Sequence, residues 1–168
     1  VVETDSDNDG AKSFRIFDEG GTELAAAPAD VGRYKLIAYT AEGRNYNAGS
    51  RSFDYEIRPA ELTVSADSKQ TVYGTPAPDF TYSISGIVNN EAAEAIIDDS
   101  TLRYTCAYTV GNDVGEYDII PSDMSVISGN YVIKTYVSAK LGVLQAEPDI
   151  SIANLEALNH VYNAVGIE

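Results

Sequence analysis

The chain has 168 residues, with 12 Tyr, four Phe and no Trp, and 44% of its residues are apolar, which favours half-buried strands over long helices. Its 26 Asp and Glu against 11 Lys and Arg give a formal net charge of -15, so phosphate backbones and anionic membrane surfaces would be repelled. We therefore expect no nucleic-acid partner and, since no run of 18 apolar residues occurs, no membrane insertion. The single Cys excludes an internal disulfide, and no signal peptide is expected in this stretch.

A five-residue motif occurs twice, 83 residues apart. Residues 30–34 read Asp-Val-Gly-Arg-Tyr and residues 113–117 read Asp-Val-Gly-Glu-Tyr. In both copies the Gly is expected to take a positive φ in a tight turn, and the Tyr to open an alternating strand. The motif predicts an internal repeat of small modules of about 80 to 90 residues each.

Two prolines mark the expected module boundaries, because Pro cannot donate to a central ladder. Pro59 and Pro148 are each followed 14 residues later by the Tyr of a Val-Tyr pair, Tyr73 and Tyr162. This equal spacing sets the register of the repeat. We expect an N-terminal β module, which could be an incomplete repeat, then a complete module and the start of a third repeat. Their predicted bounds are residues 1–58, 59–147 and 148–168.

Alternating apolar and polar residues predict strands through most of the chain. The clearest cover residues 14–17, 34–40, 51–57, 62–66, 80–84, 102–108, 117–120, 131–137 and 140–144. One helix of two turns is predicted over residues 89–97, capped by Asn89 or Asn90 and with Glu91 in its first turn. Elsewhere the apolar period is two, so no other helix is expected.

Several segments of the middle module together carry a family resemblance. They are Leu62-Thr63-Val64, Val72-Tyr73-Gly74-Thr75-Pro76-Ala77-Pro78, Tyr82 to Gly86, Gly115-Glu116-Tyr117, Asn130-Tyr131 and a closing strand. This string, about half of the chain, resembles the bacterial MBG surface repeat of the Tyr-Gly type. Residues 11–58 resemble the back part of a related or immunoglobulin-like repeat. Residues 148–168 resemble the front of a third copy, although Asn163 stands where Gly is expected.

The expected fold class is mainly β, with tandem small antiparallel-sheet modules. The element order of the middle module fits a β-grasp-like sheet with one short helix across it. An immunoglobulin-like β-sandwich is the alternative, because its tyrosine corner has a similar Asp-x-Gly-x-Tyr pattern, although the second Cys and the buried Trp of an antibody domain are missing.

A metal site is the first candidate for chemistry. Asp5, Asp7 and Asp9 place oxygen ligands at alternate positions before a Gly, as in a calcium loop, but Ile16 stands where an EF-hand loop carries its bidentate Glu. A hairpin turn rich in Asp and Asn is the favoured interpretation of the run, and no metal or cofactor is assigned.

Catalytic groups are the second candidate. Cys106 lies on the apolar face of a predicted strand, so we expect its thiol to be buried and inert. For His160 the sequence offers no partner group that would make it catalytic. Asp98 and Asp99 are interpreted as a solvated turn. We therefore predict no enzyme activity and no catalytic residue.

The resemblance implies an extracellular location, on a bacterial cell surface or secreted, and a non-catalytic stalk or spacer role in an adhesin-like protein. The alternative is a carbohydrate- or protein-binding adhesion module, with a host glycan or protein as ligand of the parent protein. Neighbouring repeats are the expected structural partners. In particular, residues 150–162 are expected to add as a strand to the first module of a neighbouring molecule.

Overall fold

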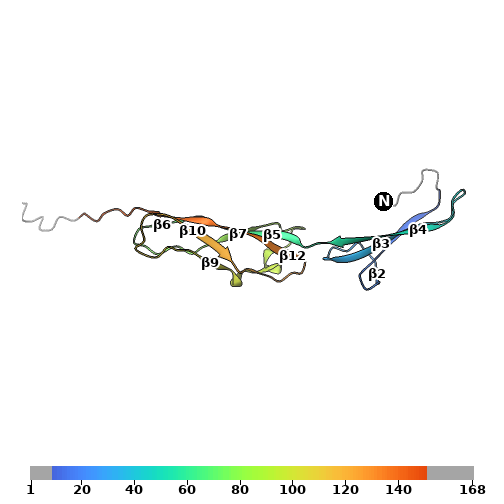
Figure 1. Ribbon diagram of the computed structural model, residues 1–168, viewed down its shortest axis with the longest axis horizontal. Helices are drawn as coiled ribbons and strands as arrows, with labels where there is room; N and C mark the ends of the chain where they lie inside the picture. Colours follow the sequence, from blue (N-terminus) through green and yellow to red (C-terminus); the bar gives the residue numbers. More distant parts are fainter. Residues whose placement is uncertain (1–8, 151–168) are drawn as a thin grey trace, which may run out of the picture.

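The computed structural model describes residues 9–150, and nearly all of its regular structure is β-strand. The strands form two regions that follow one another along the long axis of the molecule (Figure 1). We call them the N-terminal sheet (residues 12–57) and the second unit (residues 60–144). The prediction of a mainly β fold is confirmed. No helix within the described part of the chain is long and apolar enough to cross a membrane.

The N-terminal sheet has four antiparallel strands in the order β2-β1-β3-β4. They are β1 (Lys12–Phe17), β2 (Glu23–Leu24), β3 (Gly32–Thr40) and β4 (Gly49–Ile57). Asp18 fixes the β1–β2 turn, because its carboxylate accepts a hydrogen bond from the Thr22 amide at 2.7 Å. Within residues 9–150, β4 pairs with β3 alone, so the other edge of β4 is open.

One face of the N-terminal sheet is apolar, because strand pleating places alternate residues on the same side. The register aligns Leu24, Ile16, Leu36 and Phe53 in one row across all four strands. Ile16 is buried, but Phe53 is 48% exposed. This sheet therefore has a hydrophobic face with little covering it among the described residues.

The second unit contains nine strands and two short 3₁₀ turns. The strands are β5 (Ala60–Ala66), β6 (Lys69–Val72), β7 (Tyr82–Ser85), β8 (Ile97–Asp98), β9 (Arg103–Thr105), β10 (Gly115–Ser122), β11 (Ser125–Val126), β12 (Tyr131–Val137) and β13 (Ala139–Leu144). They form sheets in the orders β6-β13-β10-β9, β12-β5-β7 and β11-β8. The β12–β5 and β13–β6 pairs are parallel. The two larger sheets are therefore mixed, where antiparallel modules were expected, while β8 and β11 pair antiparallel.

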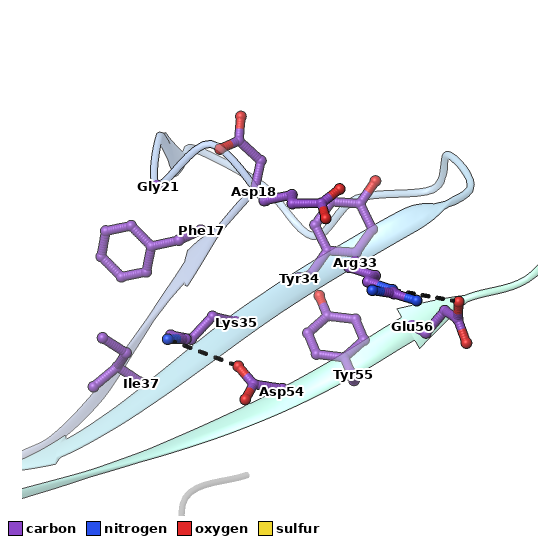
Figure 2. A pocket seen from close by; sticks show the side chains of 11 residues that line it. Phe17, Asp18, Gly21, Arg33, Tyr34, Lys35, Ile37, Asp54, Tyr55 and Glu56 are labelled. Carbon is purple, nitrogen blue, oxygen red and sulfur yellow. Dashed lines mark ion pairs between the residues drawn. The ribbon is translucent and has the colours of Figure 1, made fainter.

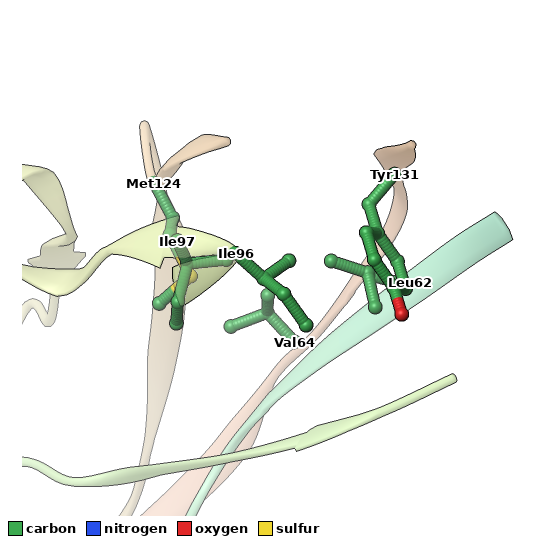
Figure 3. Packing of buried hydrophobic residues seen from close by; sticks show 6 residues of the cluster. All are labelled: Leu62, Val64, Ile96, Ile97, Met124 and Tyr131. Atoms are coloured by element: carbon green, nitrogen blue, oxygen red, sulfur yellow. The ribbon is translucent and has the colours of Figure 1, made fainter. Parts of the chain in front are cut away.

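The second unit has two hydrophobic clusters. Figure 3 shows the first, in which Leu62 and Val64 of β5 pack with Ile96, Ile97, Met124 and Tyr131. The second cluster joins the sheet of β10 and β13 to the loop around residue 108. It consists of Tyr108, Ile119, Leu141 and Val143, with Ala66, Phe80, Tyr104, Cys106 and Tyr117 packed against it. Together the clusters hold the layers of the unit against each other.

The predicted two-turn helix over residues 89–97 is wrong. Asn89 and Asn90 have φ values of 57° and 56°, which place both in the left-handed region that forms a turn. Ala92 is extended, so only a 3₁₀ turn, η1 (Ala93–Ala95), follows before β8 begins at Ile97. A second 3₁₀ turn, η2, covers Asp99–Thr101. No helix crosses the sheet as the β-grasp order requires.

Both copies of the Asp-Val-Gly-x-Tyr motif form the same corner. The Tyr34 hydroxyl donates to the Asp30 carbonyl at 2.9 Å, and the Tyr117 hydroxyl donates to the Asp113 carbonyl at 2.8 Å. Gly115 has the expected positive φ, 151°, but Gly32 does not. At Gly32 a Cβ would lie 3.1 Å from the Tyr34 hydroxyl, so the close approach of this ring explains the glycine better than its φ does.

Candidate functional site

The junction between the N-terminal sheet and the second unit is built around Asn130. Its side-chain carbonyl accepts a hydrogen bond from the Val31 amide, and its side-chain amide donates to the Asp30 carboxylate, both at 2.9 Å. Its backbone carbonyl accepts from the Ala60 amide at 2.9 Å. One residue of the second unit thus holds the motif corner of the sheet and the first residue of β5.

Local sequence explains how these groups meet. Ser128-Gly129-Asn130 forms the turn before β12, in which the Tyr131 amide donates to the Ser128 carbonyl at 3.3 Å. Asp30 begins the corner before β3, and only Arg58 and Pro59 separate β4 from β5. Sequence reasoning did not identify this contact, because an Asn before a strand is an ordinary turn signal.

A hollow of about 750 Å³ lies over the corner end of the N-terminal sheet (Figure 2). It is lined by Phe17, Asp18, Glu19, Gly21, Arg33, Tyr34, Lys35, Ile37, Asp54, Tyr55 and Glu56. The Tyr34 and Tyr55 rings stack with centroids 5.5 Å apart and an angle of 29° between their planes. The hollow therefore combines aromatic surface with charged groups of both signs.

The charged groups of this hollow pair across β3 and β4. Arg33 Nε lies 3.8 Å from Glu56 Oε1, and Lys35 Nζ lies 3.9 Å from Asp54 Oδ1 (Figure 2). These pairs are long and solvent-exposed, so each adds little to stability. They leave hydrogen-bonding capacity for a polar ligand, but no nucleophile lies beside a general base in the hollow.

The carboxylates singled out from the sequence have structural roles where they can be described. Asp98 accepts hydrogen bonds from the Ser100 amide and hydroxyl and so begins η2, which contains Asp99. Asp9 accepts from the Arg44 amide at 2.8 Å. Asp5 and Asp7 lie outside the described residues. Within residues 9–150 no three His, Cys, Asp or Glu side chains cluster to hold a metal ion.

Cys106 is partly exposed rather than buried, which corrects the prediction from its alternating neighbours. The strand β9 ends at Thr105, so Cys106 follows it in a loop and packs only against the rim of the second hydrophobic cluster. Within residues 9–150 no hydrogen bond joins Cys106 to a Lys, Arg or His side chain. His160 lies outside the described residues.

Comparison with known proteins gives a family match for the second unit. No curated protein and no solved structure matches the chain. Residues 62–142 match the family model described as MBG domain (YGX type), a match that spans β5 to β13 and both hydrophobic clusters. This part of the chain therefore matches the MBG domain family of the YGX type, a kind of domain that indicates a surface-associated repeat module.

Proposed function

We propose that this chain is a non-catalytic stalk or spacer segment of an extracellular, bacterial cell-surface or secreted protein of the adhesin-like kind. The MBG domain supports the surface association. The proposal includes no cofactor and no metal. It assigns the described residues a mechanical task, which is to hold successive modules in line.

The Asn130 junction is the observation that carries this proposal. A spacer must transmit direction from one module to the next. The linker has two residues, and two hydrogen bonds between the Asn130 side chain and the corner at Asp30 and Val31 restrict rotation across it. The bond from the Ala60 amide to the Asn130 carbonyl holds Asn130 itself on β5. Each such bond contributes about 1 kcal/mol. The two regions lie end to end in consequence (Figure 1).

Residual dipolar couplings test the rigidity of this junction. We expect couplings from the N-terminal sheet and the second unit to fit a single alignment tensor. The substitution Asn130→Ala should separate them into two tensors, whereas Asn112→Ala should not, because Asn112 bonds only Thr109 in its own loop. Two tensors for the wild-type chain would contradict the spacer role.

Accessibility on cells tests the location. An antibody raised against residues 9–150 should bind intact cells that produce the parent protein, without permeabilisation. Binding only after lysis would contradict a surface location.

A binding role is the second candidate, favoured by the aromatic hollow of the N-terminal sheet. Stacked Tyr rings beside charged side chains suit a carbohydrate or a polar peptide. A glycan array would show signals that Tyr55→Ala removes and Tyr39→Ala retains, since Tyr39 lines a different hollow of the same sheet. An array without signal above background would reject a glycan ligand.

A further inference from the structure

The open edge of β4 corresponds to an occupied edge in the second unit. Tyr34 pairs with Tyr55, and Gly32 with Ile57, in the same way that Tyr117 pairs with Leu141 and Gly115 with Val143. The motif corner therefore aligns β4 with β13. In the second unit β13 carries β6 on its outer edge as a parallel strand. The counterpart of β6 is missing beside β4 within residues 9–150.

The sequence contains a second copy of the segment that could fill this edge. The Pro59 to Tyr73 spacing recurs from Pro148 to Tyr162, so Lys69–Val72 aligns with residues 158–161, which read Leu-Asn-His-Val. Ile150 stands near the start of this copy, two residues after its Pro, and is 82% exposed. An exposed Ile at the start of this copy presents apolar surface that a partner strand can cover.

We propose that residues 149–162 of one molecule, the donor segment, add to the open edge of β4 in a second copy of this chain. Residues 158–161 would run parallel to β4, with Leu158 opposite Tyr55 and His160 opposite Ile57, as Lys69 and Thr71 face Leu141 and Val143. The contact joins molecules head to tail. It does not depend on where the protein works, so it can fail while the spacer proposal stands.

Reach excludes the same contact within one molecule. The strands β12 and β13 follow one another along the second unit, and the 14 residues 131–144 span about 45 Å at ~3.3 Å per residue. Residues 145–150 follow β13 away from the N-terminal sheet, and β4 lies beyond the opposite end of the second unit, past β12 (Figure 1). The eight steps from Ile150 to Leu158 cover at most about 28 Å. The donor segment must therefore come from another molecule.

Charge also favours the N-terminal sheet as the acceptor. Residues 9–58 hold seven of the 11 Lys and Arg residues of the chain, against eight Asp and Glu. Residues 59–147 hold four Lys and Arg against 12 Asp and Glu, and residues 148–168 hold three Asp and Glu with no Lys or Arg. An acidic donor segment is repelled less by the nearly neutral sheet than by the second unit.

The apolar face of the acceptor sheet gives the contact its hydrophobic component. Phe53 and Phe14 are 48% and 57% exposed, and both lie on the face that Ile16 and Leu36 share. In the second unit the aligned face is covered, with Ile119 and Leu141 fully buried. The donor segment brings Ile150, Ile152 and Leu158, which share one face of an extended strand, to a face that still exposes aromatic surface.

Analytical ultracentrifugation of the full chain at rising concentration tests the association. We expect concentration-dependent growth beyond the dimer, because each molecule has one donor segment and one open edge. The double substitution Ile150→Asp/Leu158→Asp should raise the dissociation constant at least about tenfold. Ile150 is 82% exposed, so a change there leaves the described fold intact. The control Val110→Asp, at a site 59% exposed in the second unit, should have no effect.

Disulfide trapping tests the register. In a Cys106→Ala background, chains with Glu56→Cys are mixed with differently tagged chains with Asn159→Cys, positions that the alignment with Gly142 and Gln70 places opposite each other. We expect a mixed-tag disulfide dimer. The matched pair Ser52→Cys with Asn159→Cys, four residues out of register on the same strand, should form far less. A chain that stays monomeric, association insensitive to the double substitution, or equal trapping of both pairs would overturn the proposal.

Discussion

The N-terminal sheet and the second unit contain the same corner followed by the same strand, yet they bury it differently. Leu36 and Ile119 each stand two residues after the corner Tyr. Ile119 is fully buried, whereas Leu36 is only partly buried. The difference comes from what lies above the strand, since in the second unit Phe80, Tyr104 and Tyr108 cover it. A strand pattern thus specifies which face is apolar, but not which segment covers that face.

The largest expected effect on stability comes from substituting a glycine of the second unit, compared with a glycine of the N-terminal sheet. Gly86, after β7, has a φ of 98°, and a Cβ there would lie 2.1 Å from the Glu61 carbonyl oxygen. Gly86→Ala combines backbone strain with a clash against β5, so we expect a loss of about 5 kcal/mol in the free energy of unfolding. Gly21 has a φ of 81° but open space around it, so Gly21→Ala should lose only about 1 kcal/mol.

Urea denaturation followed by circular dichroism measures both glycine variants. Equal losses at Gly86 and Gly21 would show that the contact between Gly86 and β5 is looser than described. If the two regions unfold in separate transitions, each loss should appear in the transition of its own region.

The next effect tests the difference in covering. Ile119→Ala should lower the free energy of unfolding by about 3 kcal/mol, because it opens a cavity in a packed cluster. Leu36→Ala should cost about 1 kcal/mol, since its side chain is already partly in water. Thermal unfolding of both variants at low protein concentration gives the comparison. At high concentration the cost at Leu36 should rise if the donor segment covers its face, and a constant cost would count against that covering.

The sequence predicts single strands well and their assembly less well. β12 was predicted at its observed bounds, because Tyr131 to Val137 alternate between two clear turns. The helix over residues 89–97 failed because local turn preferences of two Asn residues outweighed the helix preference of the Ala and Glu residues that follow. The parallel β13–β6 pair could not be foreseen, since its register depends on contacts far apart in the chain.

The sequence predicted the candidate site less well than it predicted the strands. The Asn130 junction joins groups about 100 residues apart in sequence, and an isolated Asn carries no signal of such a contact. The hollow over Tyr34 and Tyr55 depends on the β3–β4 register in the same way. The alternating pattern places both Tyr residues on strands, but their stacking appears only when the strands are paired.

The smallest effect concerns two tyrosines of the second cluster. The Tyr108 hydroxyl donates to the Thr75 carbonyl at 2.7 Å, so Tyr108→Phe should cost about 1 kcal/mol. The Tyr104 hydroxyl oxygen is buried and has no hydrogen-bond partner within the described chain. Tyr104→Phe removes an unsatisfied polar group, and we expect no loss or a gain of up to about 1 kcal/mol at neutral pH.

Tyr104→Phe should also change the stability at alkaline pH. Burial raises the pKa of Tyr104 above its usual value of 10.0, and the nearby Asp67 carboxylate and Tyr82 raise it further. Because the folded state holds this proton more tightly than the unfolded state, stability is full below about pH 10 and falls as the pH rises from there through the folded-state pKa. Tyr104→Phe should therefore flatten the fall in unfolding free energy above about pH 10, relative to the wild type. Urea titrations at a series of pH values measure this slope, and a Tyr104→Phe slope as steep as that of the wild type would assign the alkaline loss to other groups.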